Sequence, residues 1–197
     1  MEFQGILNNI SRHITLSSDE VELFTSMLNK KSLSRKLLLL RQDQLCRSIY
    51  FVDKGALRTY HCDKSGREST VMFAVNDWWV TDMPCFISGQ PSMVFIEAIE
   101  DSEIFELSKA NFDLLFEKIP LFERFFRILM QNAYIREQLR IIQNLSLTAE
   151  ERYDKFMDKY PQISKLVTQK QIASYLGITP EFLSAIRKNK SVAKRNQ

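Results

Sequence analysis

The sequence has few of the residues that build disulfide frameworks or metal sites. Its 197 residues include three cysteines and two histidines. Cys46, Cys62 and Cys85 are widely separated and form no CxxC pair, and His13 and His61 stand apart without metal-ligand spacing. We therefore expect reduced, structural thiols and no metal centre.

Long apolar runs are also missing. No run approaches the roughly 20 residues that a membrane-spanning helix needs. The N-terminus, MEFQGILNNISRH, lacks the charged start and apolar centre of a signal peptide. Hydrophobic residues make up 45% of the chain, which is ample for a packed core. We expect a folded cytoplasmic protein that has no membrane partner.

Sequence signatures of catalysis are absent as well. There is no Ser/His/Asp or Cys/His arrangement, no phosphate-binding loop and no dinucleotide fingerprint. The acidic pairs Glu100-Asp101 and Glu150-Glu151 fall where a turn and a helix cap are expected. The sequence therefore predicts a protein that is not an enzyme.

The segment TQKQIASYLGITPEFLSAIRKN, near the C-terminus, has the pattern of two short helices joined by a sharp turn. Thr168 can cap the first helix, because Gln171 follows three positions later as in a capping box. Gly177 can adopt the left-handed backbone that ends this helix. Thr179 and Pro180 then suit the N-cap and the first position of a second helix.

The two predicted helices, 168–176 and about 180–188, can share a small core. Ala173 is short enough to let their axes approach closely. The apolar positions of this core are Ile172, Leu176, Ile178, Leu183 and Ile186. This spacing is typical of a DNA-reading helix-turn-helix, although an ordinary pair of packed helices with a solvated polar face remains an alternative.

One face of the second helix lies opposite Leu183 and Ile186. It carries four residues spaced at i, i+3, i+4 and i+7, which are Glu181, Ser184, Ala185 and Lys188. In a major groove, Glu181 could accept from a cytosine amino group, Ser184 could bond to either base type and Ala185 could touch a thymine methyl. Lys188 and the start of the first helix suit phosphates. The predicted DNA-binding residues are Thr168, Gln169, Lys170, Thr179, Glu181, Ser184, Ala185, Arg187, Lys188 and Lys190. Of these, Arg187 is expected nearer the buried side.

Charge supports a nucleic-acid partner. Residues 162–197 contain seven basic residues and one acidic residue, a net charge of +6, whereas 1–161 contain 20 basic and 23 acidic residues, a net charge of −3. A cationic segment of this kind is the electrostatic footprint expected of a protein that binds DNA phosphates.

From about Leu33 to Leu107 the pattern is that of an all-β region. Short strand-like runs are predicted over 48–52, 56–60, 68–73, 94–98 and 103–107. Asp53-Lys54-Gly55 and Asp63-Lys64-Ser65-Gly66 separate neighbouring runs, and we interpret both as hairpin turns.

Helical periodicity returns after Ser108, first over 111–117 and then over about 120–144. The second helix would extend about 36 Å at 1.5 Å per residue, and an apolar stripe along it suits a seam with a second copy of the chain. The predicted homodimer interface consists of Leu121, Phe125, Ile128, Ile135, Leu139 and Ile142. The alternative is that the stripe packs entirely on its own β-domain.

Another capping-box signal, Thr148-Ala149-Glu150-Glu151, opens a helix that should end near Lys159. The preceding residues, 143–147, are the expected hinge. We thus predict a β-roll sensor domain over 1–119, a dimerisation helix and hinge over 120–145, and a helix-turn-helix domain over 146–197.

A β-roll, a long helix and a C-terminal helix-turn-helix together resemble the Crp/Fnr family of bacterial transcription regulators. The resemblance implies an α+β fold with a cyclic-nucleotide-binding-like jelly roll, a dimerisation helix and a winged helix-turn-helix. It also implies a homodimer that binds double-stranded DNA at a roughly palindromic promoter site, with two reading helices about 34 Å apart. RNA polymerase is a further expected partner if the protein activates transcription.

The same resemblance predicts that cyclic AMP does not bind. Family members that bind cyclic nucleotides carry a Gly-Glu pair and, further on, an Arg-Ser or Arg-Thr pair. In the matching stretch, VTDMPCFISGQPSMV, Thr81-Asp82 and Ser92-Met93 stand in these places. A serine cannot replace the charge and the fork of donors of an arginine, and Asp82 would repel an anion. Near the expected adenine site, Ile135-Arg136 also suits the base poorly.

Another effector is left open, because aromatic residues surround the same stretch. The candidate effector pocket consists of Phe73, Trp78, Trp79, Asp82, Phe86, Ser92, Phe95, Ile135 and Arg136, with core packing as the alternative for its aromatic members. No cofactor is predicted: an iron-sulfur cluster is disfavoured by the lack of an N-terminal cysteine cluster. The alternative function is a ligand-binding or protein-interaction module whose helix-turn-helix no longer reads DNA. Ala185 replaces an arginine often found in the family's reading helix, so the operator sequence stays open.

Overall fold

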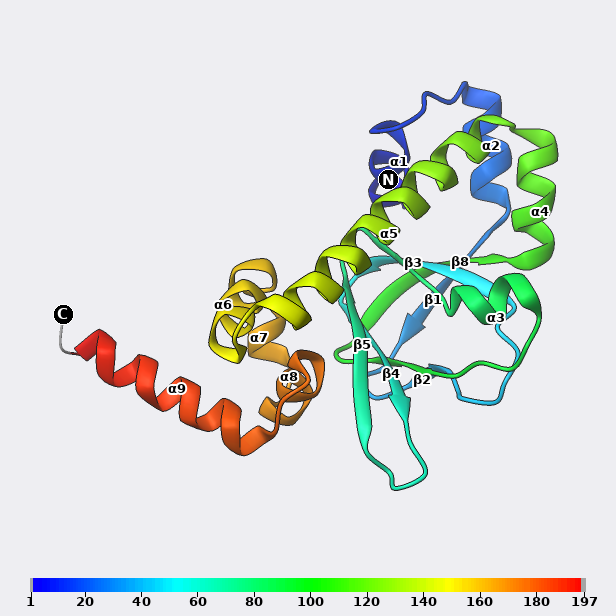
Figure 1. Cartoon of the computed structure of the whole chain (residues 1–197). Helices are drawn as coiled ribbons and strands as arrows, with labels where there is room; N and C mark the ends of the chain where they lie inside the picture. Colours follow the sequence, from blue (N-terminus) through cyan, green and yellow to red (C-terminus); the bar gives the residue numbers. More distant parts are fainter. Residues whose placement is uncertain (1, 196–197) are drawn as a thin grey trace.

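Two four-stranded antiparallel sheets pack together in the N-terminal part of the molecule (Figure 1). The computed structural model describes residues 2–195. The sheets have the strand orders β1-β8-β3-β6 and β2-β7-β4-β5. Their strands are β1 (Leu28–Leu33), β2 (Leu38–Leu40), β3 (Ser48–Lys54), β4 (Ala56–Cys62), β5 (Glu68–Val75), β6 (Trp78–Val80), β7 (Phe95–Ala98) and β8 (Ser102–Ser108). With helices on either side in the sequence, this β-roll confirms the predicted α+β class.

The five predicted strand runs correspond to β3, β4, β5, β7 and β8, whereas the prediction omitted β1, β2 and β6. One predicted turn is wrong. Strand β3 pairs with β6 and β8, and β4 pairs with β5 and β7, so Asp53-Lys54-Gly55 joins two sheets and closes no hairpin. Gly55 has φ +94°, and a Cβ there would lie 2.3 Å from the Ser102 hydroxyl oxygen. Turn residues mark where the chain reverses but do not determine whether the flanking strands pair.

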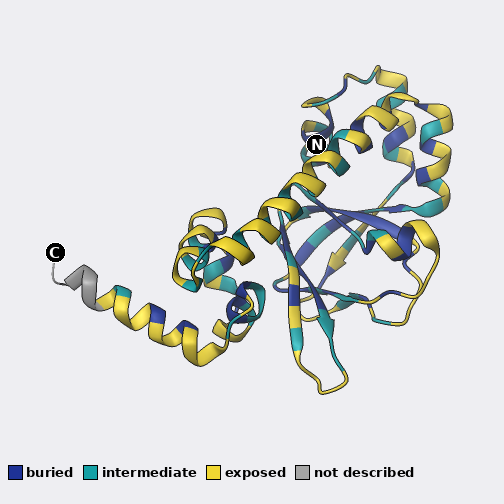
Figure 2. Cartoon of the chain, in the orientation of Figure 1, coloured by how far each residue is buried: buried dark blue, intermediate teal, exposed yellow. Residues whose placement is uncertain are grey.

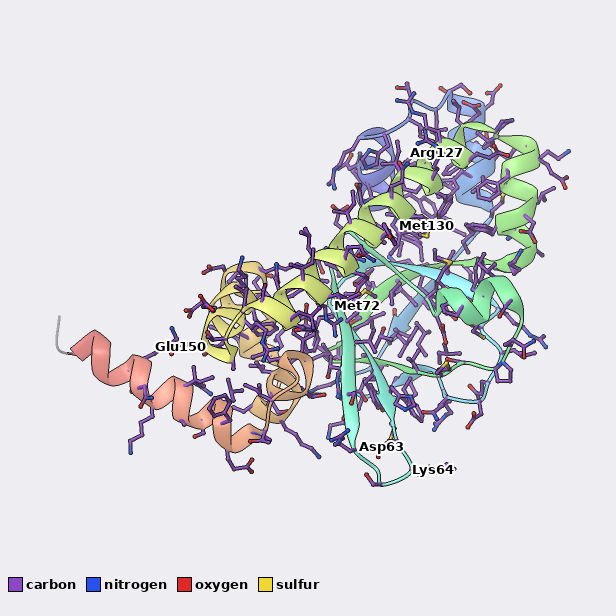
Figure 3. All side chains as sticks on the ribbon, viewed as in Figure 1. Asp63, Lys64, Met72, Arg127, Met130 and Glu150 are labelled. Carbon is purple, nitrogen blue, oxygen red and sulfur yellow. The ribbon has the colours of Figure 1, made fainter. Side chains whose placement is uncertain are left out.

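The second predicted turn does close a hairpin, between β4 and β5. The Asp63 carboxylate accepts hydrogen bonds from the backbone N–H groups of Ser65 and Arg67, at 2.9 and 3.0 Å. Figure 3 shows Asp63 and Lys64 at the tip of this hairpin, which extends well beyond the rest of its sheet. The side-chain oxygen of Asp63 thus holds the turn, as is typical of aspartate at this position.

Helices cover one end of the β-roll and supply aromatic side chains to its core. They are α1 (Gln4–Ser11), α2 (Ser18–Ser26), α3 (Met83–Ser88), α4 (Lys109–Lys118) and the first turns of α5 (Leu121–Ser146). Phe24 of α2 and Phe122 of α5 have ring centroids 4.8 Å apart, and both side chains are fully buried. The first half of the long helix therefore belongs to the core of its own β-domain.

Phe125 is a correction to the predicted dimer interface. It is 0% exposed and contacts Trp79 at a ring-centroid distance of 5.9 Å. Periodicity identified the apolar stripe but could not tell which part of it packs against the chain's own sheets.

A second core joins the β-roll to the C-terminal helices. Successive strand residues point to opposite faces, so Leu57 and Ala74 enter the first core while Ala56 and Phe73 enter the second. Phe73 is fully buried, and its ring centroid lies 5.4 Å from that of Tyr175 in the helix-turn-helix. The second sheet is therefore buried on both faces near these residues.

The C-terminal helices are α6 (Ala149–Lys159), α7 (Ile163–Leu166), α8 (Gln169–Leu176) and α9 (Pro180–Arg195). The break between α5 and α6 is confined to Leu147 and Thr148, where the predicted capping box forms. Within residues 2–195, no strand follows β8, so the implied wing is not found there. Helix α9 continues past the predicted end at Lys188, since no glycine or proline interrupts the sequence that follows.

Candidate nucleic-acid interface

The turn between α8 and α9 forms from the residues that the sequence indicated. The Thr168 hydroxyl accepts from the Gln171 backbone N–H at 3.2 Å, and the Gln171 side chain accepts from the Thr168 backbone N–H at 2.9 Å. Gly177 has φ +69° and ends α8. The Thr179 hydroxyl then accepts from the Phe182 N–H at 3.2 Å and caps α9. Local hydrogen bonds thus fix the angle at which α9 leaves the turn.

The apolar residues between these helices are packed as predicted. Those that are fully enclosed are Ile172, Ala173, Leu176, Leu183 and Ile186, and Ile178 is half-buried. Because Leu183 and Ile186 anchor one face of α9, the opposite face has no protein to cover it.

The residues predicted to read bases on α9 are exposed. Glu181, Ser184, Ala185 and Lys188 are all exposed, and Figure 2 shows α9 projecting away from the rest of the molecule. The other candidates at the surface are Thr168, Gln169, Lys170, Thr179 and Arg187. Arg187 was expected nearer the buried side but is exposed. Nine of the ten predicted contact residues are therefore accessible to a partner.

Lys190 is the exception. It is half-buried, and its Nζ lies 2.8 Å from the Asp154 carboxylate and 3.1 Å from the Glu150 carboxylate of α6. The hydrogen bond to Asp154, with further contributions from Glu150, raises the pKa of Lys190. Its charge is thus already balanced within the protein, in a contact between two helices that sequence periodicity could not pair.

A hydroxyl in α8 fastens the helix-turn-helix to the β-roll. Ser174 accepts from the Thr70 backbone N–H at 2.7 Å and donates to the Glu68 carbonyl at 2.8 Å. Sequence reasoning missed this anchor, because its partners are more than 100 residues away and a serine within a helix is an ordinary residue. The edge of β5 therefore holds α8 in place.

In the stretch that resembles a phosphate cassette, residues 80–94, the Asp82 carboxylate accepts hydrogen bonds from neighbouring donors. The Asp82 carboxylate accepts from the Ser92 hydroxyl at 2.7 Å and from the Met93 and Cys85 backbone N–H groups at 3.2 and 3.4 Å. Asp82 is 7% exposed and Ser92 is 1% exposed. Donors that could bind a phosphate are thus occupied by an internal anion.

The predicted effector pocket is not assembled as one site. Phe73 and Trp79 lie in the two cores, Phe86 packs on Phe112 at 5.1 Å, and Phe95 stacks on Tyr60 at 5.2 Å between ring centroids. Phe73, Trp79 and Phe86 are buried core residues, whereas Phe95 is half-buried. Successive residues of a strand point to opposite faces and those of a helix point around its axis, so closeness in sequence did not bring these side chains into one cavity.

Trp78 and Arg136 do lie close together. The Arg136 guanidinium is 4.9 Å from the Trp78 ring centroid, while Ile135 is 54% exposed. Ile135 and Arg136 line a cavity between α5 and the C-terminal helices. This cavity is separate from the Asp82–Ser92 pair, which does not line it.

The second half of α5 carries exposed apolar residues. Ile128 is half-buried, whereas residues further along the helix are more open. The exposed apolar side chains of α5 are Leu121, Tyr134, Ile135, Leu139, Ile141, Ile142 and Leu145. These apolar side chains are grouped along one helix and not scattered singly over the surface. Such grouping is typical of a surface that a partner covers.

Comparisons with known proteins agree with this architecture. The family model described as the cyclic nucleotide-binding domain matches residues 30–118. The regulatory protein HlyX of Actinobacillus pleuropneumoniae is 25% identical over 186 residues, covering 87% of this chain and 76% of that protein. The fumarate and nitrate reduction regulatory protein of Vibrio cholerae is also 25% identical, over 87% of this chain and 73% of its own. These similarities support a transcription regulator of the Crp/Fnr family.

A solved Crp/Fnr structure shows the same fold. The transcriptional regulator from Eubacterium rectale superposes with a TM-score of 0.75 at 18% identity, over 98% of this chain and 89% of the other. Because the match covers 98% of this chain, it includes the long helix and the C-terminal helices as well as the β-roll. Among residues 2–195, none of the helices has the length and hydropathy that crossing a membrane requires.

Proposed function

We propose that this protein is a homodimeric DNA-binding transcription regulator of the Crp/Fnr type. One observation carries the proposal: the polar face of α9 is exposed and lies opposite an anchored apolar face, in the segment that holds the chain's excess of positive charge. The side chains of this face are already exposed in the single chain. The segment's charge of +6 supplies the attraction to phosphates.

In the proposed complex, α9 lies in the major groove and the N-terminus of α8 faces the backbone. Glu181, Ser184 and Ala185 would contact base edges, whereas Lys170 and Lys188 would contact phosphates. Thr168 and Thr179 hold the two helix starts in position through their caps. Base contacts provide specificity, and phosphate contacts fix the register.

The exposed stripe on α5 is the proposed dimer seam. Ile135, Leu139 and Ile142 are each more than half exposed in the single chain, as an unpaired seam would be. A two-fold axis along α5 would present two copies of α9 about one turn of DNA apart, which suits a palindromic site.

We further propose that the Asp82 cassette does not bind cyclic AMP. Its carboxylate already takes the hydroxyl and N–H donors, and an incoming phosphate would meet a buried negative charge. Thermal unfolding with micromolar cyclic AMP tests this. We expect an unchanged Tm, and a rise of several degrees would contradict the proposal.

Salt-dependent DNA binding tests the main proposal. Fluorescence anisotropy would be measured on a duplex selected from a random library and on an unselected duplex. Lys170→Ala and Lys188→Ala should each weaken binding to both duplexes and lower the slope of log K against log salt by about one unit. Lys118→Ala, an exposed lysine on α4, is the matched control and should leave the slope unchanged.

The same experiment distinguishes a DNA-binding regulator from the alternative function. A protein-interaction module with a degenerate helix-turn-helix would select no duplex from the library. It would also show the same weak, nonspecific binding in the wild type and in both lysine variants. That result would contradict the assignment of α9 as a reading helix.

A further inference from the structure

A cavity of about 550 Å³ lies where the long helix meets the helix-turn-helix. Its walls come from α5, β5, α6 and α8, which are far apart in the sequence. Met72, on the wall from β5, is labelled in Figure 3 where that strand approaches α5. The volume falls within the range of pockets that hold small organic ligands.

The lining of this cavity is strongly cationic. Five basic side chains and two acidic ones contribute to it. The basic residues are Arg136, Arg140, Arg152, Lys155 and Lys159, and the acidic residues are Glu137 and Asp158. These residues lie on α5 and α6 and give the lining a net charge of +3. The whole chain also has a net charge of +3.

Two of the arginines are held in place by aromatic rings. The Arg136 guanidinium lies 4.9 Å from the Trp78 ring centroid, and that of Arg140 lies 4.8 Å from the Tyr175 ring centroid. Arg140 also donates to the Val71 carbonyl. Both guanidiniums share one carboxylate, Glu137, each at 3.6 Å. The cations are thus positioned, but one carboxylate balances only one of them.

Part of this charge lacks a hydrogen-bond acceptor. The buried Nε atom of Arg152 has no hydrogen-bond partner, and that of Arg136 makes no hydrogen bond but lies 3.6 Å from the Glu137 carboxylate. Nη1 of Arg152 reaches Asn144 at 3.4 and 3.5 Å. Burial, followed by repulsion from Arg136 and Arg140, lowers the pKa of Lys159, against the opposing effect of Glu137. Buried donors without acceptors are costly, so an anion in this position would stabilise the protein.

We propose that this cavity binds a small organic phosphate that carries at least two negative charges. Guanidinium groups suit phosphate oxygens because they donate in a fixed fork. Phe156, Tyr160 and Tyr175 give the cavity an aromatic wall for the organic part of the ligand. The proposal does not depend on DNA binding, and the site is separate from the cassette of Asp82.

Such a ligand would act on the arrangement of the two domains. It would contact α5 and β5 on one side and α6 and α8 on the other, so its binding would favour the docked position of the helix-turn-helix. The Ser174 anchor and the ligand would then support the same state.

The test measures binding of adenosine 5′-diphosphate and of inorganic pyrophosphate to the full chain, by calorimetry and thermal unfolding at matched ionic strength. We expect saturable binding of both probes, a Tm rise of several degrees, and tighter binding of the nucleotide because of the aromatic wall. Equal affinities would assign the site to inorganic anions and overturn the organic part of the proposal. No binding of either probe would overturn it entirely.

Arg152→Gln and Lys155→Gln should each weaken both probes by about tenfold, since each removes one charged donor. Lys165→Gln, an exposed lysine of α7 outside the cavity, is the matched control and should bind as the wild type does. Far-ultraviolet circular dichroism of each variant checks the fold. Unchanged binding in both cavity variants would contradict the site.

A second comparison separates this proposal from the proposed function. Lys170→Ala and Lys188→Ala should lose DNA affinity but keep the affinity for adenosine 5′-diphosphate. If duplex DNA instead competes with pyrophosphate and Arg152→Gln lowers the salt slope of DNA binding, the cavity receives a DNA phosphate, and the small-molecule proposal is wrong.

Discussion

At the scale of single residues, a buried carboxylate decides what the cassette region can do. Asp82 accepts hydrogen bonds from Ser92, Met93 and Cys85, so an internal group has taken the donors of an anion site. The sequence showed that the expected arginine was missing. It did not show that Asp82 turns inward to cap α3 and to bond with Ser92. That orientation depends on the loop that returns to this helix.

The Asp82–Ser92 bond gives a prediction about stability. Ser92→Ala removes a buried donor from a carboxylate that has little solvent contact, so it should lower the free energy of unfolding by about 1–3 kcal/mol. Urea unfolding measures the change. Ser34→Ala, at an exposed position between β1 and β2, is the control and should change stability by less than about 0.5 kcal/mol. Equal effects of the two substitutions would contradict the role of Ser92.

At the scale of elements, the helix-turn-helix is the part that local sequence specified best. Its caps, its glycine and its apolar spacing all concern residues within a few positions of one another, and all formed as predicted. Helix α5 was predicted in its extent but only partly in its contacts. Phe125 turned inward while Ile142 stayed exposed, although both belong to one apolar stripe.

Gly177 gives a prediction at this scale. Gly177→Ala should cost about 1 kcal/mol, because φ +69° is strained for alanine while its Cβ would meet no atom within 4 Å. Gly177→Asn should cost less, since asparagine tolerates the left-handed region better. Thermal unfolding of both variants checks this order. If both destabilise the protein equally, backbone strain is not the cause.

At the scale of the whole molecule, three contacts hold the helix-turn-helix against the β-roll. They are the aromatic cluster around Phe73, the Ser174 bonds to the edge of β5 and the Arg140 contacts with Tyr175 and Val71. These contacts set where α9 projects and enclose the cationic cavity. The position of α9 is therefore coupled to the sheet and to α5.

The exposed stripe on α5 gives a prediction about assembly. Ile142→Glu would place like charges across a two-fold seam, so light scattering should give the mass of a single chain where the wild type gives that of a dimer. Ile87→Glu makes the same change at an exposed isoleucine on α3 and should remain dimeric. A monomeric wild type, or a dimeric Ile142→Glu variant, would contradict a seam along this helix.

The sequence by itself determined the elements that depend on neighbours along the chain: five of the strands, the long helix, the capped helix-turn-helix and the cationic C-terminal segment. Backbone preferences, caps and periodicity act over a few residues, so they can be recognised in sequence. Only the tertiary structure decided that Gly55 joins two sheets, that Phe73 lies between domains, that Lys190 pairs with α6 and that five cations meet in one cavity. These outcomes depend on which side of each element faces which distant partner, and packing of the whole chain is what sets those faces.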